Sequence, residues 1–245
     1  MPVRSLEKQT MSVQIAENII EDICAGNYEP GASLPSEQSL ASQYGVSRPV
    51  VREAFKFLSA QGFVSIANGK GTTIKAVNDE LLRVFMRRVL AEGQQSNLKD
   101  LFELRISLEK VSASYAAVHR TEKEVEQLDA ILQEMERYLD KPAIYSEFDI
   151  KFHVLIAEAS HNIFMFHLIS SIRETLVSLG SRMRQQLPEE KLSIIHAYHI
   201  SIFKKIKLQD AAGAAKAMEA HFQTAMERLD KMLKADPRRD KAKKI

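Results

Sequence analysis

Four side chains in the second half of the sequence could together hold a metal ion. Asp149 and His153 are one helical turn apart, so they share one face of a predicted helix. His199 and His221 each fall within an apolar stripe of helical spacing, which predicts that both face the interior. Three imidazoles and a carboxylate suit Zn²⁺, Ni²⁺ or Mn²⁺ and leave coordination positions open for water or an incoming carboxylate.

A second interpretation of these histidines stays open on the residues alone. A single inward-facing histidine is more often a hydrogen-bonded core residue than a metal ligand. The remaining histidines have no comparable group of partners in the sequence, so we assign them this ordinary role; they are His119, His161, His167 and His196.

Basic side chains near residue 50 could contact nucleic acid. Arg48, Arg52 and Lys56 follow one side of a predicted helix whose other side is apolar. An arginine in the first turns of such a helix can bond to both O6 and N7 of guanine, whereas Lys70, in a predicted turn, suits a phosphate or the minor groove. Residues 36–76 carry five basic residues against two acidic ones. The alternative is that Arg48 and Arg52 form an ordinary solvated face.

The segments around these basic residues predict three helices. The first covers residues 13–25, with Cys24 in its core face. The second follows Ser36, a suitable N-cap, and ends at Gly45, where a left-handed residue is favoured. The third follows Ser47, carries Pro49 in its first turn and stops at Gly62. The last two, joined by a tight turn, are typical of a helix-turn-helix.

A hairpin follows the third helix. Residues 63–66 and 72–74 alternate as short strands, and the pair Asn68 and Gly69 between them favours a turn with positive φ. Together with the helices, this hairpin predicts a winged helix-turn-helix domain over residues 1–76.

After residue 76 the sequence predicts an all-helical domain, so the protein as a whole is mainly α. Glycine becomes rare, and short breakers separate long amphipathic segments, which is typical of an antiparallel helical bundle. Asn97 is suited to cap a helix that runs to about His119, and Thr121 with Glu124 forms a capping box. Further helices are predicted over residues 78–92, 143–159, 163–186, 189–207 and 210–233, within a domain of residues 77–245 that ends in a basic tail.

Composition excludes several classes of protein. Of the 245 residues, 45% are hydrophobic and 27% are charged, which supplies a globular core and argues against disorder. One cysteine cannot form an internal disulfide, and residues 1–8 contain no hydrophobic leader. No apolar run approaches the roughly 18 to 20 residues that span a bilayer. We therefore expect a soluble, cytoplasmic protein with no membrane partner.

Four short motifs in the first domain follow a known pattern: Leu34-Pro35-Ser36-Glu37, Tyr44-Gly45-Val46-Ser47-Arg48, Val51-Arg52-Glu53-Ala54 and Leu58-Ser59-Ala60-Gln61-Gly62-Phe63-Val64. With them, residues 10–75 resemble the DNA-binding domain of the GntR family of bacterial transcription regulators. The resemblance implies that Arg48 and Arg52 read operator bases and that Asn68 enters the minor groove. Many members have arginine where this chain has Gln38, so that contact is expected to be weaker or directed to adenine. The candidate DNA-contacting residues are Ser36, Gln38, Ser47, Arg48, Arg52, Asn68, Gly69 and Lys70.

The second domain carries motifs of its own: Glu103-Leu104-Arg105 with Glu109, Phe148-Asp149 with His153, Ala159-Ser160-His161-Asn162, and His199 followed by Asp210 and His221. With them, about residues 80–230 resemble the FCD effector domain of the FadR subfamily. The resemblance implies that Asp149, His153, His199 and His221 bind a metal, Zn²⁺ in the first place, which anchors an organic-acid effector. It also implies that Arg105 points towards the effector carboxylate. The alternative for Arg105 is a surface salt bridge to Glu109, and Arg184 is a second, weaker candidate.

These expectations combine into a homodimeric, ligand-responsive repressor and not an enzyme. Two recognition helices would occupy the half-sites of a palindromic operator, and a small carboxylate would bind the metal and Arg105. One alternative is a hydrolase that uses the Asp149 and histidine site to activate water, although it leaves the first 75 residues without a role. Another is a regulator whose metal is purely structural.

Overall fold

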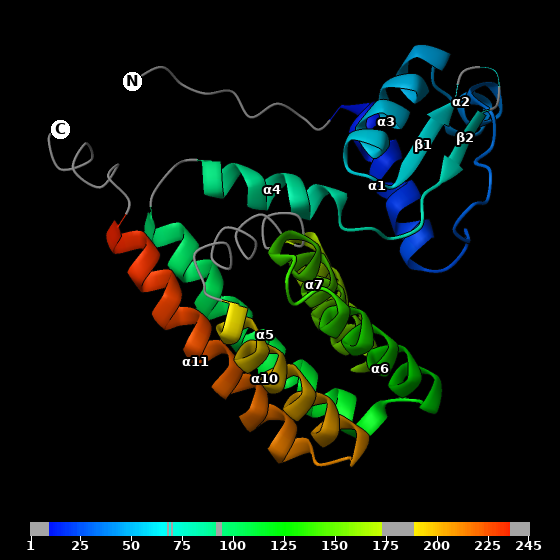
Figure 1. Cartoon of the computed structure of the whole chain (residues 1–245). Coiled ribbons are helices and arrows are strands. Elements are labelled where there is room, and N and C mark those ends of the chain that lie inside the picture. Colours follow the sequence, from blue (N-terminus) through cyan, green and yellow to red (C-terminus); the bar gives the residue numbers. More distant parts are fainter. Residues whose placement is uncertain (1–9, 68, 70, 92–94, 173–188, 236–245) are drawn as a thin grey trace, which may run out of the picture. The chain divides into compact units, whose positions relative to one another are not determined.

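The computed structural model describes residues 10–67, 69, 71–91, 95–172 and 189–235 (Figure 1). They form two compact units, which divide between Leu81 and Leu82. Most of the described residues are helical, and the strands among them form one two-stranded sheet. The predicted mainly α fold class is therefore confirmed.

The first unit is a three-helix core with a hairpin. Helix α1 (Met11–Cys24) and helix α2 (Glu37–Tyr44) both pack on helix α3 (Arg48–Ala60). Strands β1 (Val64–Ala67) and β2 (Gly71–Ile74) follow as the wing. The shared core is made of apolar side chains at helical spacing, which include Ile15, Ile19, Leu40, Val51, Phe55 and Leu58.

The turn between α2 and α3 follows from its residues. The Ser36 hydroxyl accepts a hydrogen bond from the Ser39 amide at 3.1 Å and so caps α2. Gly45 ends α2 with φ of 65°, a left-handed conformation that glycine adopts without strain. Ser47 stands at the N-cap of α3 as predicted, but its side chain makes no capping hydrogen bond.

The hairpin has a single antiparallel register. Val64 pairs with Ile74, and Ala67 pairs with Gly71 at the end of the wing. Ser33 forms a further isolated bridge with Thr73, so the segment before α2 adds to the edge of the sheet. Among the residues of the predicted turn, Gly69 has φ of 74°, whereas Asn68 and Lys70 lie outside the described residues.

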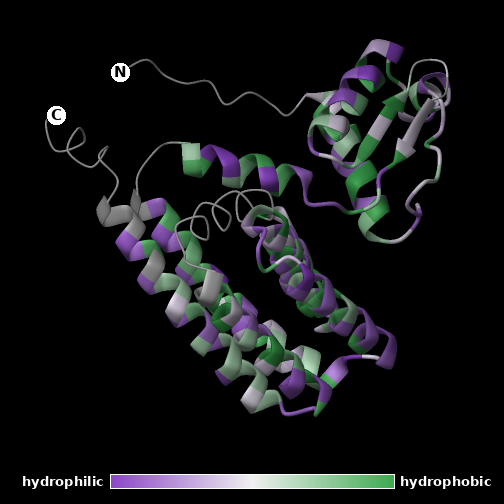
Figure 2. Ribbon diagram, in the orientation of Figure 1, coloured by the Kyte–Doolittle hydropathy of each residue, from purple (hydrophilic) through white to green (hydrophobic). Residues whose placement is uncertain are grey.

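The second unit is a helical bundle. Its helices are α4 (Glu80–Ala91, which begins just before the division), α5 (Gln95–His119), α6 (Glu122–Arg137), α7 (Pro142–Ala159), α8 (Ile163–Ser171), α10 (Glu189–Lys207) and α11 (Ala211–Ala235). Helix α5 packs along α11 and against α7, α10 packs on α11, and α7 packs on α6 and α8. The long helices of this unit mix hydrophilic and hydrophobic residues, as Figure 2 shows, which is expected of amphipathic helices around a shared core.

Helix α7 is the most enclosed of the bundle helices that carry candidate ligands. Its buried side chains lie on several faces and include Tyr145, Asp149, Phe152, His153 and Ile156. Because α5, α6 and α8 all contact it, the polar groups on its buried faces, such as Asp149 and His153, are withdrawn from water. Such groups need partners inside the bundle.

Two predictions of local structure are wrong. Cys24 is exposed, because it lies five residues after Ile19 on α1, about 140° around the helix from that buried side chain. Asn97 does not cap a helix, since α5 already begins at Gln95; its side-chain amide instead donates to the Val89 carbonyl at 2.8 Å and satisfies one of the last carbonyls of α4.

Some predictions fall outside the described residues. Helix α8 ends at Ser171, and the rest of the helix predicted over residues 163–186, with Arg184, falls in residues 173–188, which are not described. Residues 236–245, which hold most of the basic tail, are not described either. Within the described parts of the chain, no helix is both long and apolar enough to cross a membrane.

The capping box of α6 yields a test of stability. Thr121 accepts from the Glu124 amide, and the Glu124 carboxylate accepts from the Thr121 amide at 2.7 Å. Thr121→Ala should lower the unfolding free energy of the helical unit by about 1 kcal/mol, because the cap is lost. Thr121→Ser keeps the hydroxyl and serves as the control in urea denaturation followed by circular dichroism. Equal stability of the alanine and serine variants would contradict the assigned cap.

Candidate metal centre and nucleic-acid interface

The four predicted metal ligands meet inside the second unit. Asp149 and His153 come from α7, His199 from α10 and His221 from α11. One donor atom from each lies within 4.8 Å of the donors of the others. All four side chains are buried, with exposed fractions between 0% and 7%. Three helices that are separate in sequence therefore bring the predicted set together.

The rings and the carboxylate are closely packed. The ring centroids of His199 and His221 are 4.4 Å apart, and that of His153 lies 5.5 Å and 5.2 Å from them respectively. Asp149 Oδ1 lies 3.0 Å from His199 Nε2. A carboxylate oxygen and three imidazole nitrogens at this spacing are a donor set that suits a divalent transition metal.

The protonation state of His221 also fits a metal. Burial, together with nearby His199 and His153, lowers the pKa of His221 well below its usual value. A neutral imidazole is the form that binds metal. Within the described part of the chain, His221 Nδ1 and both ring nitrogens of His153 are buried and make no hydrogen bond. A neutral imidazole can bind a cation through the lone pair of one ring nitrogen without first losing a proton.

Two further polar groups contact the imidazoles from outside the ligand set. The Tyr145 hydroxyl lies 3.2 Å from His199 Nδ1, and a Glu109 carboxylate oxygen contacts His153 Nδ1. Partners of this kind orient the rings of metal ligands. Sequence reasoning missed Tyr145 in this role, although Tyr145, Asp149 and His153 recur every four residues on α7, a spacing that could have revealed it.

Arg105 and Glu109 form a buried ion pair on α5. Arg105 Nε donates to Glu109 Oε1, and the two side chains are 6% and 1% exposed. The Arg105 guanidinium carbon also lies 4.8 Å from the centre of the Phe222 ring, next to His221 in the sequence. The salt bridge that we considered as the alternative therefore exists, but it lies in the interior and not on the surface.

Glu109 is ionised in this setting. Burial raises the pKa of its carboxyl group, but the charge of Arg105 and the contact with His153 outweigh burial and leave the pKa below its usual value. An ionised carboxylate in the core is stable only beside such partners. The ion pair and the histidine cluster thus form one connected polar group.

The other four histidines do not join the cluster. His196 is buried beside the Tyr145 ring, and burial lowers its pKa. His161 contacts Glu124 at 3.1 Å, while His119 and His167 lie edge-on to the rings of Tyr115 and Phe166. None of them belongs to a group of potential metal ligands among the described residues.

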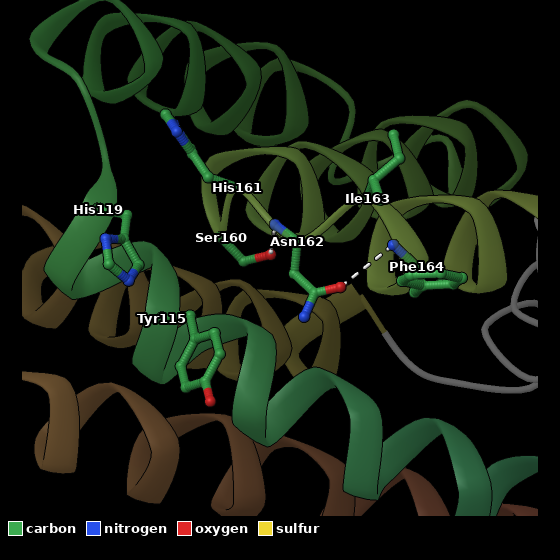
Figure 3. Close-up of a pocket in the computed structure, with 7 residues that line it drawn as sticks. All are labelled: Tyr115, His119, Ser160, His161, Asn162, Ile163 and Phe164. Carbon is green, nitrogen blue, oxygen red and sulfur yellow. Dashed lines mark hydrogen bonds between the residues drawn. The ribbon is translucent and has the colours of Figure 1, made fainter. Parts of the chain in front are cut away.

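A hollow of about 390 Å³ lies on the surface of this unit (Figure 3), lined by Tyr115, His119, Ser160, His161, Asn162, Ile163 and Phe164. Several of its polar groups already have structural partners. The Asn162 side chain accepts from the Phe164 amide at 3.1 Å and caps α8, and the Ser160 hydroxyl accepts from the Asn162 amide. We therefore assign this hollow no ligand.

The predicted DNA-contacting residues that the structure describes lie on the surface of the first unit. Arg48 and Arg52, in the first turns of α3, have side chains that are 60% and 54% exposed. Ser36, Gln38, Ser47 and Gly69 are exposed as well. Ser36 and Gln38 stand on either side of Glu37 at the start of α2, and Glu37 contacts Arg52 on α3. The start of α2 therefore lies beside the first turns of α3.

Glu37 joins these arginines, a contact that sequence reasoning missed. It accepts two hydrogen bonds from Arg52, at 3.0 Å from Nε and 2.8 Å from Nη2, and lies 3.7 Å from Arg48 Nη2. The hydrogen bonds from Arg52 lower the pKa of Glu37. The planar pairing fixes the direction of the Arg52 side chain. No sequence spacing links the two, since fifteen residues separate them.

Comparison with known proteins gives consistent matches. The model of the gntR family of bacterial regulatory proteins matches residues 11–74, and the FCD domain model matches residues 100–224. A putative L-lactate dehydrogenase operon regulatory protein of Escherichia coli is 32% identical over 90% of this chain and 88% of its own. The HTH-type transcriptional regulator LutR of Bacillus subtilis is 32% identical over 80% of this chain and 91% of its own.

Two further matches are more distant. The HTH-type transcriptional repressor NanR of Escherichia coli is 24% identical over 89% of this chain and 84% of its own. Among solved structures, a Streptococcus agalactiae GntR protein matches with a TM-score of 0.69 and 26% identity, and the match covers 89% of this chain and 99% of that one.

The buried cluster predicts that metal binding by the chain depends on Asp149. Asp149→Ala removes the candidate anionic ligand, so if these residues hold zinc we expect the zinc bound per chain to fall well below that of the wild type, measured by elemental analysis after dialysis. Glu158→Ala, an exposed carboxylate on the same helix, is the matched control. Unchanged zinc content in the Asp149 variant would show that these residues are not the ligands.

Proposed function

This chain belongs to the GntR family of bacterial transcription regulators and carries an FCD domain, and from that membership we propose how it binds DNA and senses its ligand. Its domains and its relatives are those of ligand-responsive transcription regulators and not of enzymes. The hydrolase alternative is therefore set aside. The observation that carries the proposal is the buried group of Asp149, His153, His199 and His221 within the FCD domain.

The proposed effector is a small organic acid. Zn²⁺ at the four donors would supply a positive charge that binds a carboxylate, and Ni²⁺ or Mn²⁺ would serve similarly. Arg105 supports this assignment, since it lies beside Phe222 and next to the metal ligands, and its Nη2 is buried with no hydrogen bond within the described residues. One relative is named for an L-lactate dehydrogenase operon, so lactate is the first acid to test. Arg184, outside the described residues, stays a second candidate.

The proposed DNA contacts follow the surface of the first unit. Arg48 and Arg52 would read bases in the major groove, Gln38 would contact adenine, and Ser36 and Ser47 would donate to phosphates. On the wing, Asn68, Gly69 and Lys70 would approach the minor groove. A palindromic operator then requires two copies of the chain, related by a two-fold axis.

The second copy would pack on an exposed apolar face of α5. Leu104, Leu108, Val111, Tyr115 and Val118 recur at alternating intervals of four and three residues, and all but the half-buried Leu108 are at least 40% exposed. This spacing is the seam along which two helices pair. On the opposite side α5 contacts α7 and α11, so the seam faces away from the core of its own unit.

The polar residues beside this seam favour a second copy as its occupant. If two α5 helices cross antiparallel at Val111, Leu104 faces Val118 of the second copy, and the exposed Glu103 faces His119. A two-fold contact must be complementary to itself in this way. We therefore propose a homodimer built on α5.

The sign of regulation is proposed as repression, because one relative is named as a repressor. The acid would then release or remodel the complex with DNA. It can do so only if it binds the free and DNA-bound conformations with different affinity. If the metal were purely structural, the metal-free protein would stay folded and would still respond to the acid, and this outcome separates the two versions of the regulator.

Fluorescence anisotropy with the DNA upstream of the chain's own gene tests the proposal. The wild type should prefer that DNA over a random duplex, lose affinity steeply with salt, and be released by one acid of a panel that includes lactate. Arg52→Ala should lose the preference by tenfold or more, since one bidentate base contact contributes about 1 to 3 kcal/mol. Lys56→Ala, one turn later on α3, is the control. Full discrimination by the Arg52 variant would contradict the assigned recognition helix.

The dimer surface is tested by Val111→Asp. Two aspartates would face each other at the crossing point, so analytical ultracentrifugation should show a shift to monomer at micromolar concentration. Ile194→Asp, which places the same charge at an exposed apolar position on α10, should leave the dimer intact. A dimer that survives the Val111 change, or that Ile194→Asp dissociates equally, would overturn this assignment.

A further inference from the structure

Glu109 contacts two functional groups at once. One carboxylate oxygen accepts from Arg105 Nε, and the other contacts His153 Nδ1. Arg105 belongs to the proposed acid site and His153 to the proposed metal site. Glu109 is 1% exposed, so neither contact competes with bulk water. Its carboxylate therefore joins the two sites directly.

The contact with His153 determines which ring nitrogen faces the metal. An ionised carboxylate only accepts hydrogen bonds, so the proton in this contact belongs to His153 Nδ1. Both ring nitrogens of His153 are buried and neither makes an aligned hydrogen bond among the described residues, but Nδ1 lies in ion-pair contact with the Glu109 carboxylate. A proton on Nδ1 of the neutral ring would leave the lone pair on Nε2. In the opposite tautomer, with the proton on Nε2, the lone pair of His153 Nδ1 would face a lone pair of the Glu109 carboxylate, and the two would repel each other.

Arg105 has a further hydrogen-bond donor that its contact with Glu109 does not use. Its Nε is used, while Nη2 is buried with no hydrogen bond in the described part of the chain. A guanidinium group presents its donors as a planar fork that matches a second carboxylate. A carboxylate bound to Arg105 would then share the positive charge of the guanidinium group with Glu109.

We infer that Glu109 is a positioning residue that fixes the tautomer of His153 for metal binding and couples the metal site to the acid site through Arg105. An incoming carboxylate draws the positive charge of Arg105 away from Glu109, so Glu109 accepts the His153 proton more strongly. A stronger contact makes the other nitrogen of His153 a better ligand. Acid and metal thus raise each other's affinity, and by the same factor. This inference rests on the proposed metal and acid sites.

The test compares Glu109→Gln with the wild-type full chain. The amide keeps the shape of the side chain but removes the negative charge, so zinc affinity should fall by about tenfold to a hundredfold, measured by competition with a chromophoric chelator. Nitrogen-15 NMR of the metal-free protein should show His153 protonated at Nδ1 in the wild type and a mixture of tautomers in the variant. Folding of each variant is checked by circular dichroism.

Two further variants separate the coupling role from simple packing. Glu158→Gln makes the same change at an exposed position of α7 and should match the wild type in zinc affinity and tautomer. Arg105→Lys keeps a positive charge beside Glu109, so it should keep the Nδ1 tautomer and bind zinc within a few-fold of the wild type. Lysine lacks the planar fork that matches a carboxylate, so lactate, or the acid that the panel identifies, should alter its zinc affinity much less than that of the wild type.

Several outcomes would overturn the inference. Wild-type zinc affinity and an unchanged His153 tautomer in a folded Glu109→Gln variant would show that Glu109 does not position the ring. An acid effect on zinc affinity that persists in that variant would show that the coupling does not pass through Glu109. A wild type that binds no zinc would overturn the metal site and this inference together. If zinc binding and the His153 tautomer depend on Glu109 as expected, but the wild type does not prefer its operator, only the proposed DNA function would be contradicted.

Discussion

Burial of charge is the constraint on which the helical unit depends. Glu109, Asp149 and Arg105 are withdrawn from water together with three imidazoles, and each would be costly without the others. Their donors and acceptors come from α5, α7, α10 and α11, so these helices must keep one mutual arrangement for the polar groups to meet. An apolar core tolerates several packings of similar free energy, whereas this polar group favours a single one.

Much of this organisation could be predicted from spacing in the sequence. Gly45, the capping box at Thr121 and the candidate ligands on α7, α10 and α11 all follow from local rules, because caps and helix faces depend on a few neighbouring residues. The clustering of the four ligands was expected from a family resemblance and is a property of the tertiary fold. The errors at Cys24 and Asn97 are errors of one or two residues in a helix face or a helix start.

The contacts that periodicity does not predict are those between helices. It places Glu109 on α5 and Tyr145 on α7, but it does not show which imidazole each contacts. The same holds for Glu37 and Arg52, which meet only because α2 packs on α3. In both units, therefore, the residue types that could do chemistry are visible in the sequence, whereas the side chains that orient them are visible only in the fold.

The distribution of the donors over distant helices has a mechanical consequence. An ion bound by Asp149, His153, His199 and His221 would act as a crosslink that closes long loops of chain in any partly unfolded state. Opening α10 or α11 away from α7 would then require the ion to leave first. The rate at which the ion dissociates would set the lifetime of the folded unit, so its resistance to proteolysis would follow the supply of metal in the cell.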